Sequence, residues 1–219
     1  MLDILQEYRT VLWEGLSVTL RLAIYVWLWG IGIGTCLGIL SSKYPRFVGI
    51  PKAVVAFVLS GVPVLVFLFW AHYPVQAMLG VVVNPFVTAV VVLAVINTFA
   101  VASIIKSGLD DFPEQYISAA KVCGLSGWTT FTRIQLPIVL RQTIPALLPL
   151  EIGMLHATLF ASLISVDEVF RIAQRVNSVE YKPIQIYSAL AILFLGVSLP
   201  VNGLALWLRH HFTRNTSEQ

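Results

Sequence analysis

Five stretches of about twenty apolar residues constrain this sequence more than any other feature. They run from about Ser17 to Leu40, Ala53 to Ala71, Pro85 to Ile105, Thr143 to Ile164 and Ile184 to Leu208. A helix needs roughly 20 mostly apolar residues to cross the hydrocarbon core of a bilayer, which is about 30 Å thick. The sequence therefore predicts an all-α integral membrane protein with about five transmembrane helices, organised as a single transmembrane domain over residues 1–219.

Composition supports this class. Charged residues make up 11% of the chain, whereas roughly a quarter of a soluble domain is charged. The net charge of +3 comes without a dense basic patch, which argues against a nucleic-acid partner. Cys36 and Cys123 lie far apart and outside any metal-ligand spacing, so we expect neither a disulfide nor a metal site.

The distribution of Lys and Arg predicts the orientation. If the N-terminus is outside and the C-terminus cytoplasmic, nine of the 14 basic residues lie on the inner side and five on the outer side. The positive-inside rule favours that arrangement. The inner residues are Lys43, Arg46, Lys52, Lys106, Lys121, Arg133, Arg141, Arg209 and Arg214, and the outer ones are Arg9, Arg21, Arg171, Arg175 and Lys182.

The start of the chain is acidic, with three carboxylates against Arg9 in its first fifteen residues. That is the wrong sign for a cleaved signal peptide, so we expect this segment to be retained. Its apolar positions from Leu2 to Trp13 recur at helical spacing. The segment is either an interfacial helix lying flat in the outer membrane surface or an ordinary lead-in turn.

Several features inside the spans invite interpretation. Gly30, Gly34 and Gly38 fall on one helical face, which allows another helix to approach closely, either within the subunit or at a subunit interface. Pro145 and Pro149 interrupt the fourth span, which favours a helix that lines a pathway, although a simple kink is the alternative.

Polar side chains within the spans are the candidates for a pathway. Glu151 is costly at membrane depth and should face a partner or water. Asn97 and His156, with Thr158 and Ser162 nearby, either share that role or are packing residues with satisfied hydrogen bonds.

The segment between the third and fourth spans, residues 106–142, is too long and too regularly patterned for a simple connection. Pro113 and Gly124 predict a short helix over Glu114–Cys123. Ser126 can cap a second helix that stops at Pro137. A short helix held below the membrane is well placed to be moved by another protein.

This segment also carries a family resemblance. Residues 119–126, followed by Phe131, Arg133 and Pro137, resemble the "EAA" loop of ABC importer permeases, in particular those for polar amino acids. Weaker similarities lie in the second span at Gly61 and Pro63, in the fourth span at Ala161-Ser162, and in the last span at Pro200.

The resemblance implies a permease subunit of a bacterial inner (plasma) membrane with five core helices. Its implied partners are a second permease subunit (identical or related), two cytoplasmic ATPases that bind ATP-Mg, and a periplasmic or extracellular solute-binding protein. The implied ATPase-coupling residues are Ser118, Ala119, Ala120, Gly124, Leu125 and Ser126. No cofactor or catalytic residue is expected in this chain, whose sequence lacks a phosphate-binding loop, an H-E-x-x-H pair and a G-x-S-x-G turn.

The sequence also departs from the family pattern. Ser118 replaces the glutamate that names the loop, Ser103 replaces an acidic residue near the end of the third span, and Glu151 is one place out of register. The candidate pathway residues are therefore Asn97, Ser103, Glu151, His156, Thr158 and Ser162. These changes suggest an unusual ligand, such as a compatible solute or an amino-acid derivative, beside an ordinary polar amino acid.

Two other functions compete with the importer. An ATP-independent channel or secondary transporter would use Glu151 equally well but leaves the patterned loop unexplained. A membrane enzyme would need convergent catalytic side chains, and His210-His211 are more simply a cytoplasmic flank.

Overall fold

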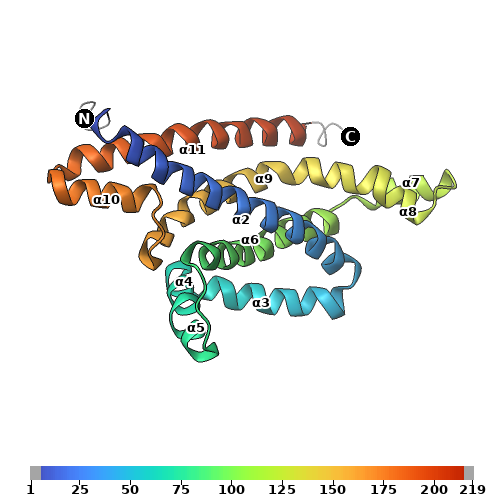
Figure 1. The fold of residues 1–219 in the computed structure, drawn as a ribbon. Coiled ribbons are helices and arrows are strands. Elements are labelled where there is room, and N and C mark those ends of the chain that lie inside the picture. The colour runs from blue at the N-terminus through green and yellow to red at the C-terminus, as the bar shows by residue number, and fades with distance from the viewer. Residues whose placement is uncertain (1–5, 215–219) are drawn as a thin grey trace.

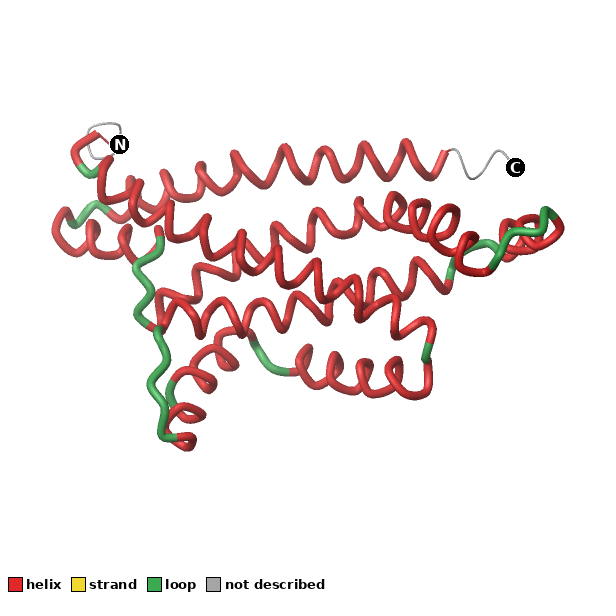
Figure 2. Tube along the Cα trace, turned by 45° about the vertical axis from the view of Figure 1, so that its right-hand side comes forward, coloured by secondary structure: helices red, strands yellow, loops and turns green. Residues whose placement is uncertain are grey.

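The structure, a computed structural model, describes residues 6–214, and these form helices joined by short loops without any strand (Figure 2). The long helices are α2 (Arg9–Lys43), α6 (Pro85–Asp110), α9 (Leu136–Ala157) and α11 (Pro183–Arg214). The shorter ones are η1 (Pro45–Gly49), α3 (Ile50–Gly61), α4 (Val64–His72), α5 (Pro74–Leu79), α7 (Glu114–Val122), α8 (Gly127–Thr130), η2 (Phe131–Gln135), η3 (Thr158–Ile164) and α10 (Val169–Glu180).

The long helices lie side by side and define two ends of the molecule (Figure 1). Within residues 6–214, four helices are long and apolar enough to cross a membrane, and a bent pair makes up to five. The prediction of about five spans is confirmed. The start of α2, α10 and the start of α11 lie at one end, which we call the α10 end. The opposite end, called the α7 end, holds α7, α8 and the C-terminal part of α11.

The second span differs from the uninterrupted helix predicted over Ala53–Ala71. The segments Pro45–Gly61 and Val64–Leu79 meet at 96°. Val62 adopts an extended backbone with ψ 123°, and Pro63 follows it. A proline disfavours helical backbone in the residue before it and has no N–H for the helical ladder, so the chain turns here. This span is therefore broken into α3 and α4.

Helix α2 packs closely against α6 through a face of glycines. Gly30, Gly34 and Gly38 are buried on α2. A Cβ at Gly34 would lie 2.8 Å from the Thr98 carbonyl oxygen, and one at Gly38 would lie 2.9 Å from that of Ala102. Small residues let two helices approach where lipid gives no hydrophobic drive between them. Of the two interpretations of this glycine face, packing within the subunit is confirmed.

The fourth span is longer than predicted. The prediction that a helix stops at Pro137 is wrong, because the wider π-helical turn η2 (Phe131–Gln135) lies just before this proline and the helix continues past it as α9. The segment Gly127–Ile164 runs on as one candidate span through α8, η2, α9 and η3. Pro145 and Pro149 lie inside α9 without ending it.

At the N-terminus, α2 continues from Arg9 to Lys43 without a break. Its 35 residues correspond to about 52 Å at 1.5 Å per residue, so the helix is longer than the apolar core of a bilayer. The part of the predicted interfacial helix from Arg9 onward is therefore continuous with the first span. Residues 2–5 of that prediction lie outside the described residues.

Candidate functional site

The loop that carries the family resemblance forms α7 and α8. Helix α7 ends with Gly124 at φ 76°, a left-handed conformation that glycine adopts without strain. The Leu125 N–H donates to the Ala120 carbonyl at 3.0 Å, and the Gly124 N–H donates to the Lys121 carbonyl at 3.0 Å. This pair of bonds is a Schellman motif. The predicted glycine cap is confirmed.

The second helix of this loop begins as predicted. The Ser126 hydroxyl accepts a hydrogen bond from the Thr129 N–H at 3.2 Å and so caps α8. Buried Phe112 packs in a cluster with Tyr116, Ile117, Phe131 and others, which holds the two short helices against the ends of α6 and α9.

The outward side of this loop is apolar. Val122 is 89% exposed, Trp128 is 73% exposed and Leu125 is 40% exposed. We call these three residues the α7–α8 tip. Among the predicted coupling residues Ala120 is buried, whereas Ser118, Ala119, Gly124, Leu125 and Ser126 are exposed. Exposed apolar residues grouped in this way are suited to contact with a membrane or another protein.

Two of the predicted pathway residues meet inside the bundle. Asn97 on α6 donates from Nδ2 to Glu151 Oε1 at 3.1 Å and to Oε2 at 2.9 Å. Trp27 on α2 donates from its indole N–H to the Glu151 carbonyl at 3.0 Å. A Cβ at Gly30 would lie 2.3 Å from Asn97 Nδ2, so α2 leaves space there for the amide. Hydrogen bonds to Glu151 thus link both α6 and α2 to α9.

The other predicted pathway residues lie elsewhere. Ser103 accepts a hydrogen bond from Lys52 Nζ at 2.9 Å, between α6 and α3. His156 bonds Ser198 at 2.9 Å, between α9 and α11. Thr158 and Ser162 donate to carbonyls within their own turn, as is common for hydroxyls in helices. The six candidates therefore do not form a single site within this chain.

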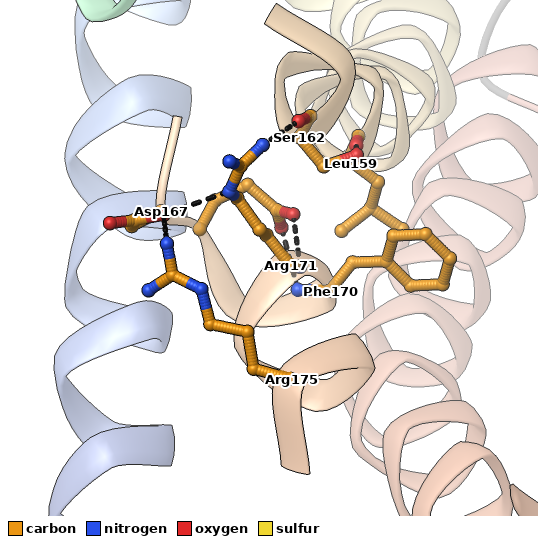
Figure 3. A network of polar contacts seen from close by, with 7 residues as sticks. Leu159, Ser162, Asp167, Phe170, Arg171 and Arg175 are labelled. Carbon is orange, nitrogen blue, oxygen red and sulfur yellow. Dashed lines mark hydrogen bonds and ion pairs between the residues drawn. The ribbon is translucent and has the colours of Figure 1, made fainter. Parts of the chain in front are cut away.

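A network of charged residues lies at the α10 end (Figure 3). Arg171 and Arg175 both pair with Asp167, at 2.9 and 2.7 Å. Arg171 also donates to the Ser162 carbonyl at 2.6 Å, which ties α10 to the last turn of η3. These pairs are partly exposed, so each contributes little stability alone. Together they fix how α10 lies against the span that precedes it.

Glu168, next to this network, is fully buried. Its carboxylate accepts the N–H groups of Phe170 at 2.8 Å and Arg171 at 2.7 Å, so it caps the start of α10. Thr19 on α2 accepts the Val169 N–H at 3.1 Å and joins the same corner to the first span. Burial raises the pKa of Glu168 to about 7 because the protein withholds water from the charged form.

This raised pKa predicts a loss of stability with rising pH. An acid whose pKa is higher in the folded than in the unfolded state binds its proton more tightly when folded. Stability is therefore full below pH 4.5 and falls as Glu168 ionises towards pH 7 and above. We expect a loss of about 2–3 kcal/mol between pH 5 and pH 8, measured as thermal unfolding in detergent. In Glu168→Gln this part of the pH dependence should vanish, and identical profiles for both proteins would contradict the assignment.

Sequence reasoning missed several of these residues. Lys52 was counted only for orientation, although its bond to Ser103 joins two helices. Glu168 had a readable signal, since an acidic residue directly before the amphipathic stretch Val169–Glu180 is a typical N-cap. No three His, Cys, Asp or Glu side chains in residues 6–214 are placed to hold a metal ion.

Comparison with known sequences matches this chain to membrane components of transport systems. Residues 30–214 match the family described as binding-protein-dependent transport system inner membrane component. The histidine/lysine/arginine/ornithine transport system permease protein HisM of Salmonella typhimurium is 28% identical, over 96% of this chain and 98% of that protein. The L-cystine transport system permease protein TcyL of Bacillus subtilis is 29% identical, over 90% and 85%. The octopine transport system permease protein OccM of Rhizobium radiobacter is 27% identical, over 94% and 89%.

Solved structures agree on the fold. The crystal structure of an amino acid ABC transporter with histidines superposes with a TM-score of 0.83 at 22% identity, covering 94% of this chain and 96% of that one. An inward-facing structure of the MetNI methionine ABC transporter superposes with a TM-score of 0.71 at 17% identity, over 92% and 98%.

Proposed function

Because the chain belongs to the binding-protein-dependent transport system inner membrane components, we propose that it conducts a polar amino acid or a similar small zwitterionic solute into a bacterial cell. The chain is an ABC importer permease, a transport subunit rather than an enzyme, and the ATPase is on separate subunits. The observation that carries the substrate class is the set of relatives, whose names specify basic amino acids, cystine and octopine. Neither a channel nor a secondary transporter is favoured.

The orientation and partners are part of the same proposal. The N-terminus lies outside and the C-terminus in the cytoplasm, supported by the excess of Lys and Arg at the inner segments. The α7–α8 tip then faces the cytoplasm and contacts an ATPase. A second permease subunit completes the pathway, and a solute-binding protein delivers the solute at the α10 end.

The mechanism follows from the rigidity of the packed helices. Binding of ATP-Mg by the two ATPases would draw them together and pull each α7 with them. Since α7 is held to α6 and α9 by the cluster around Phe112, and α6 to α2 by the glycine contacts, the pull moves these helices as one body. Rigid-body rotation of this kind switches access from one side of a membrane to the other.

The coupling part of the proposal predicts a selective loss of the ATPase. Val122 is 89% exposed at the α7–α8 tip, so Val122→Asp should leave the fold intact while it places a charge in an apolar contact. We expect about tenfold less ATPase to be retained when the permease is purified in detergent, with the partners identified by mass spectrometry. Gly124→Asp, which changes the end of α7, should act in the same direction.

Val82→Asp is the matched control, because Val82 is fully exposed in the loop between α5 and α6 at the opposite side of the bundle. It should retain the ATPase at the level of the unaltered chain. Equal retention by Val122→Asp and Val82→Asp would mean that the tip does not bind the ATPase. Failure to retain any P-loop ATPase with the unaltered chain, even after mild crosslinking, would overturn the importer assignment.

The identity of the transported solute is tested separately, by an uptake assay. Proteoliposomes that hold the complete transporter would be supplied with radiolabelled histidine, arginine, lysine, ornithine, cystine and glycine betaine, each with the solute-binding protein present. ATP-dependent accumulation of an amino acid or of glycine betaine supports the proposal, and the solute that accumulates identifies which zwitterion is carried. No ATP-dependent accumulation of any of these solutes would contradict the proposal.

A further inference from the structure

Helices α3 and α6 lie next to each other (Figure 1). A groove of about 490 Å³ lies between parts of them, and one face of each helix lines it. On α3 these positions are Ala53, Ala56, Phe57 and Ser60, and on α6 they are Ile96, Phe99, Ala100 and Ser103. Both sets have the spacing i, i+3, i+4 and i+7, which places them along a single helical stripe. Lys52 stands on the same wall, beside Ser103.

Lys52 is a buried cation with few partners. Its side chain is only 7% exposed. The ammonium group donates to the Ser103 hydroxyl at 2.9 Å, and that hydroxyl donates onward to the Phe99 carbonyl at 2.8 Å. Within residues 6–214, no carboxylate lies within ion-pair distance of Lys52. A buried charge is stable only when an opposite charge or several hydrogen bonds compensate it.

The neighbouring charges leave the site positive. Asp110 is the nearby acid, but it forms an ion pair with Lys106 and accepts a hydrogen bond from Ser42 at 2.8 Å. Lys52, Lys106 and Asp110 together carry a net charge of +1. A groove with apolar walls strengthens such a field and attracts anions.

The position of the side chain is unusual for a lysine near a helix end. Such lysines extend towards the lipid headgroups and keep their ammonium in water. Lys52 instead turns towards Ser103 on α6. Small residues on both helices, Ala53 and Ala56 on α3 and Ala100 on α6, leave the groove open next to it. This arrangement provides a cation, a hydroxyl and an apolar space for the rest of a small molecule.

We propose that Lys52, positioned by Ser103, binds the carboxylate of the transported solute in the groove between α3 and α6. This inference rests on the proposed function, since it assigns the solute's acidic group to a place in the permease. The Lys52 ammonium would pair with the negative charge of the carboxylate. The Ser103 hydroxyl, which accepts a hydrogen bond from this ammonium, would keep the ammonium in place. Amino acids, amino-acid derivatives and betaines all carry the required carboxylate.

The test measures charge selectivity inside the groove without relying on transport. In the complete transporter, with Cys36→Ser and Cys123→Ser, a reporter cysteine is introduced by Ala56→Cys, one turn from Lys52. Its rates of reaction with a negatively charged sulfonatoethyl and a positively charged trimethylammonioethyl methanethiosulfonate are compared in neutral liposomes. Lys52→Gln should lower the ratio of the negative to the positive reagent about fivefold to tenfold, the size expected for one charge at roughly 6–8 Å in a partly wet site.

Two variants serve as controls. Lys52→Arg keeps the charge and should keep the ratio within twofold. Lys43→Gln removes an exposed cation from the same end of the molecule and should also leave the ratio unchanged. The proposal would be overturned if Lys52→Gln left the ratio of the negative to the positive reagent unchanged. It would also be overturned if Lys43→Gln lowered this ratio as much as Lys52→Gln does.

The source of the anion is resolved by protection of the same cysteine. Histidine and arginine should slow its modification more than histamine and agmatine, which lack the carboxylate. Protection by phosphatidylglycerol, with none by the amino acids, would assign the groove to a lipid phosphate and overturn the proposal. If an amino acid is taken up in an ATP-dependent manner but the reporter cysteine shows no charge selectivity, this site is refuted. The proposed function then still stands.

Discussion

Replacement of Gly34 by leucine is expected to abolish accumulation of folded protein. At this position a Cβ alone would lie 2.7 Å from the Val101 Cβ and 2.8 Å from the Thr98 carbonyl oxygen. The backbone of α6 cannot turn away as a side chain can, and three further carbons must also find space. Overpacking typically costs 1–3 kcal/mol where side chains adjust, and we expect about 4 kcal/mol or more here. Against a total stability of about 5–15 kcal/mol, that is a severe loss.

The matched control lies two residues earlier on the same helix. Gly32 is exposed, and a Cβ there would meet nothing within 4 Å. Gly32→Leu therefore adds the same atoms on the outward side of α2 and should leave the yield and melting temperature nearly unchanged. Both variants would be followed by size-exclusion chromatography and thermal unfolding in detergent. Similar behaviour of the two would show that α2 and α6 do not pack through Gly34.

The apolar stretches of the sequence predicted the number of spans, because length and hydropathy decide whether a helix can cross a bilayer. They did not predict the break of the second span, although Pro63 is visible in the sequence. Hydropathy averages over a window and does not register one extended residue such as Val62. The stop predicted at Pro137 was wrong because the sequence does not reveal the π-helical turn η2 before this proline, after which the helix continues.

Local chemistry predicted the caps of α7 and α8. The positions of Gly124 and Ser126 depend on bonds within a few residues, and such bonds can be read from the chain. Contacts between distant helices could not be found this way. Nothing in the sequence pairs Asn97 with Glu151 rather than with His156, or turns Lys52 towards Ser103, since these contacts depend on how whole helices lie against each other.

The contact between Asn97 and Glu151 gives the second large expected effect. Asn97 is fully buried and Glu151 is 9% exposed, and the amide donates to both carboxylate oxygens. Asn97→Ala removes that donor and leaves the acidic group buried without its side-chain partner. A hydrogen bond to a charged group contributes about 1.5–3 kcal/mol, and an uncompensated buried charge costs about 3–5 kcal/mol. We expect a loss of about 3 kcal/mol, measured as thermal unfolding of the purified permease in detergent.

A double-mutant cycle separates this loss from the cavity that the smaller side chain leaves. Glu151→Gln removes the charge, so Asn97→Ala combined with Glu151→Gln should be about 1–2 kcal/mol more stable than the sum of the two single losses predicts. Asn202→Ala on α11 makes the same chemical change at a partly exposed position and should cost less than about 0.5 kcal/mol. Strictly additive losses would mean that the two side chains do not interact. If the losses of stability are non-additive and ATPase retention is normal, the hydrogen-bonded pair is instead identified as the polar contact that makes the three helices α2, α6 and α9 move together.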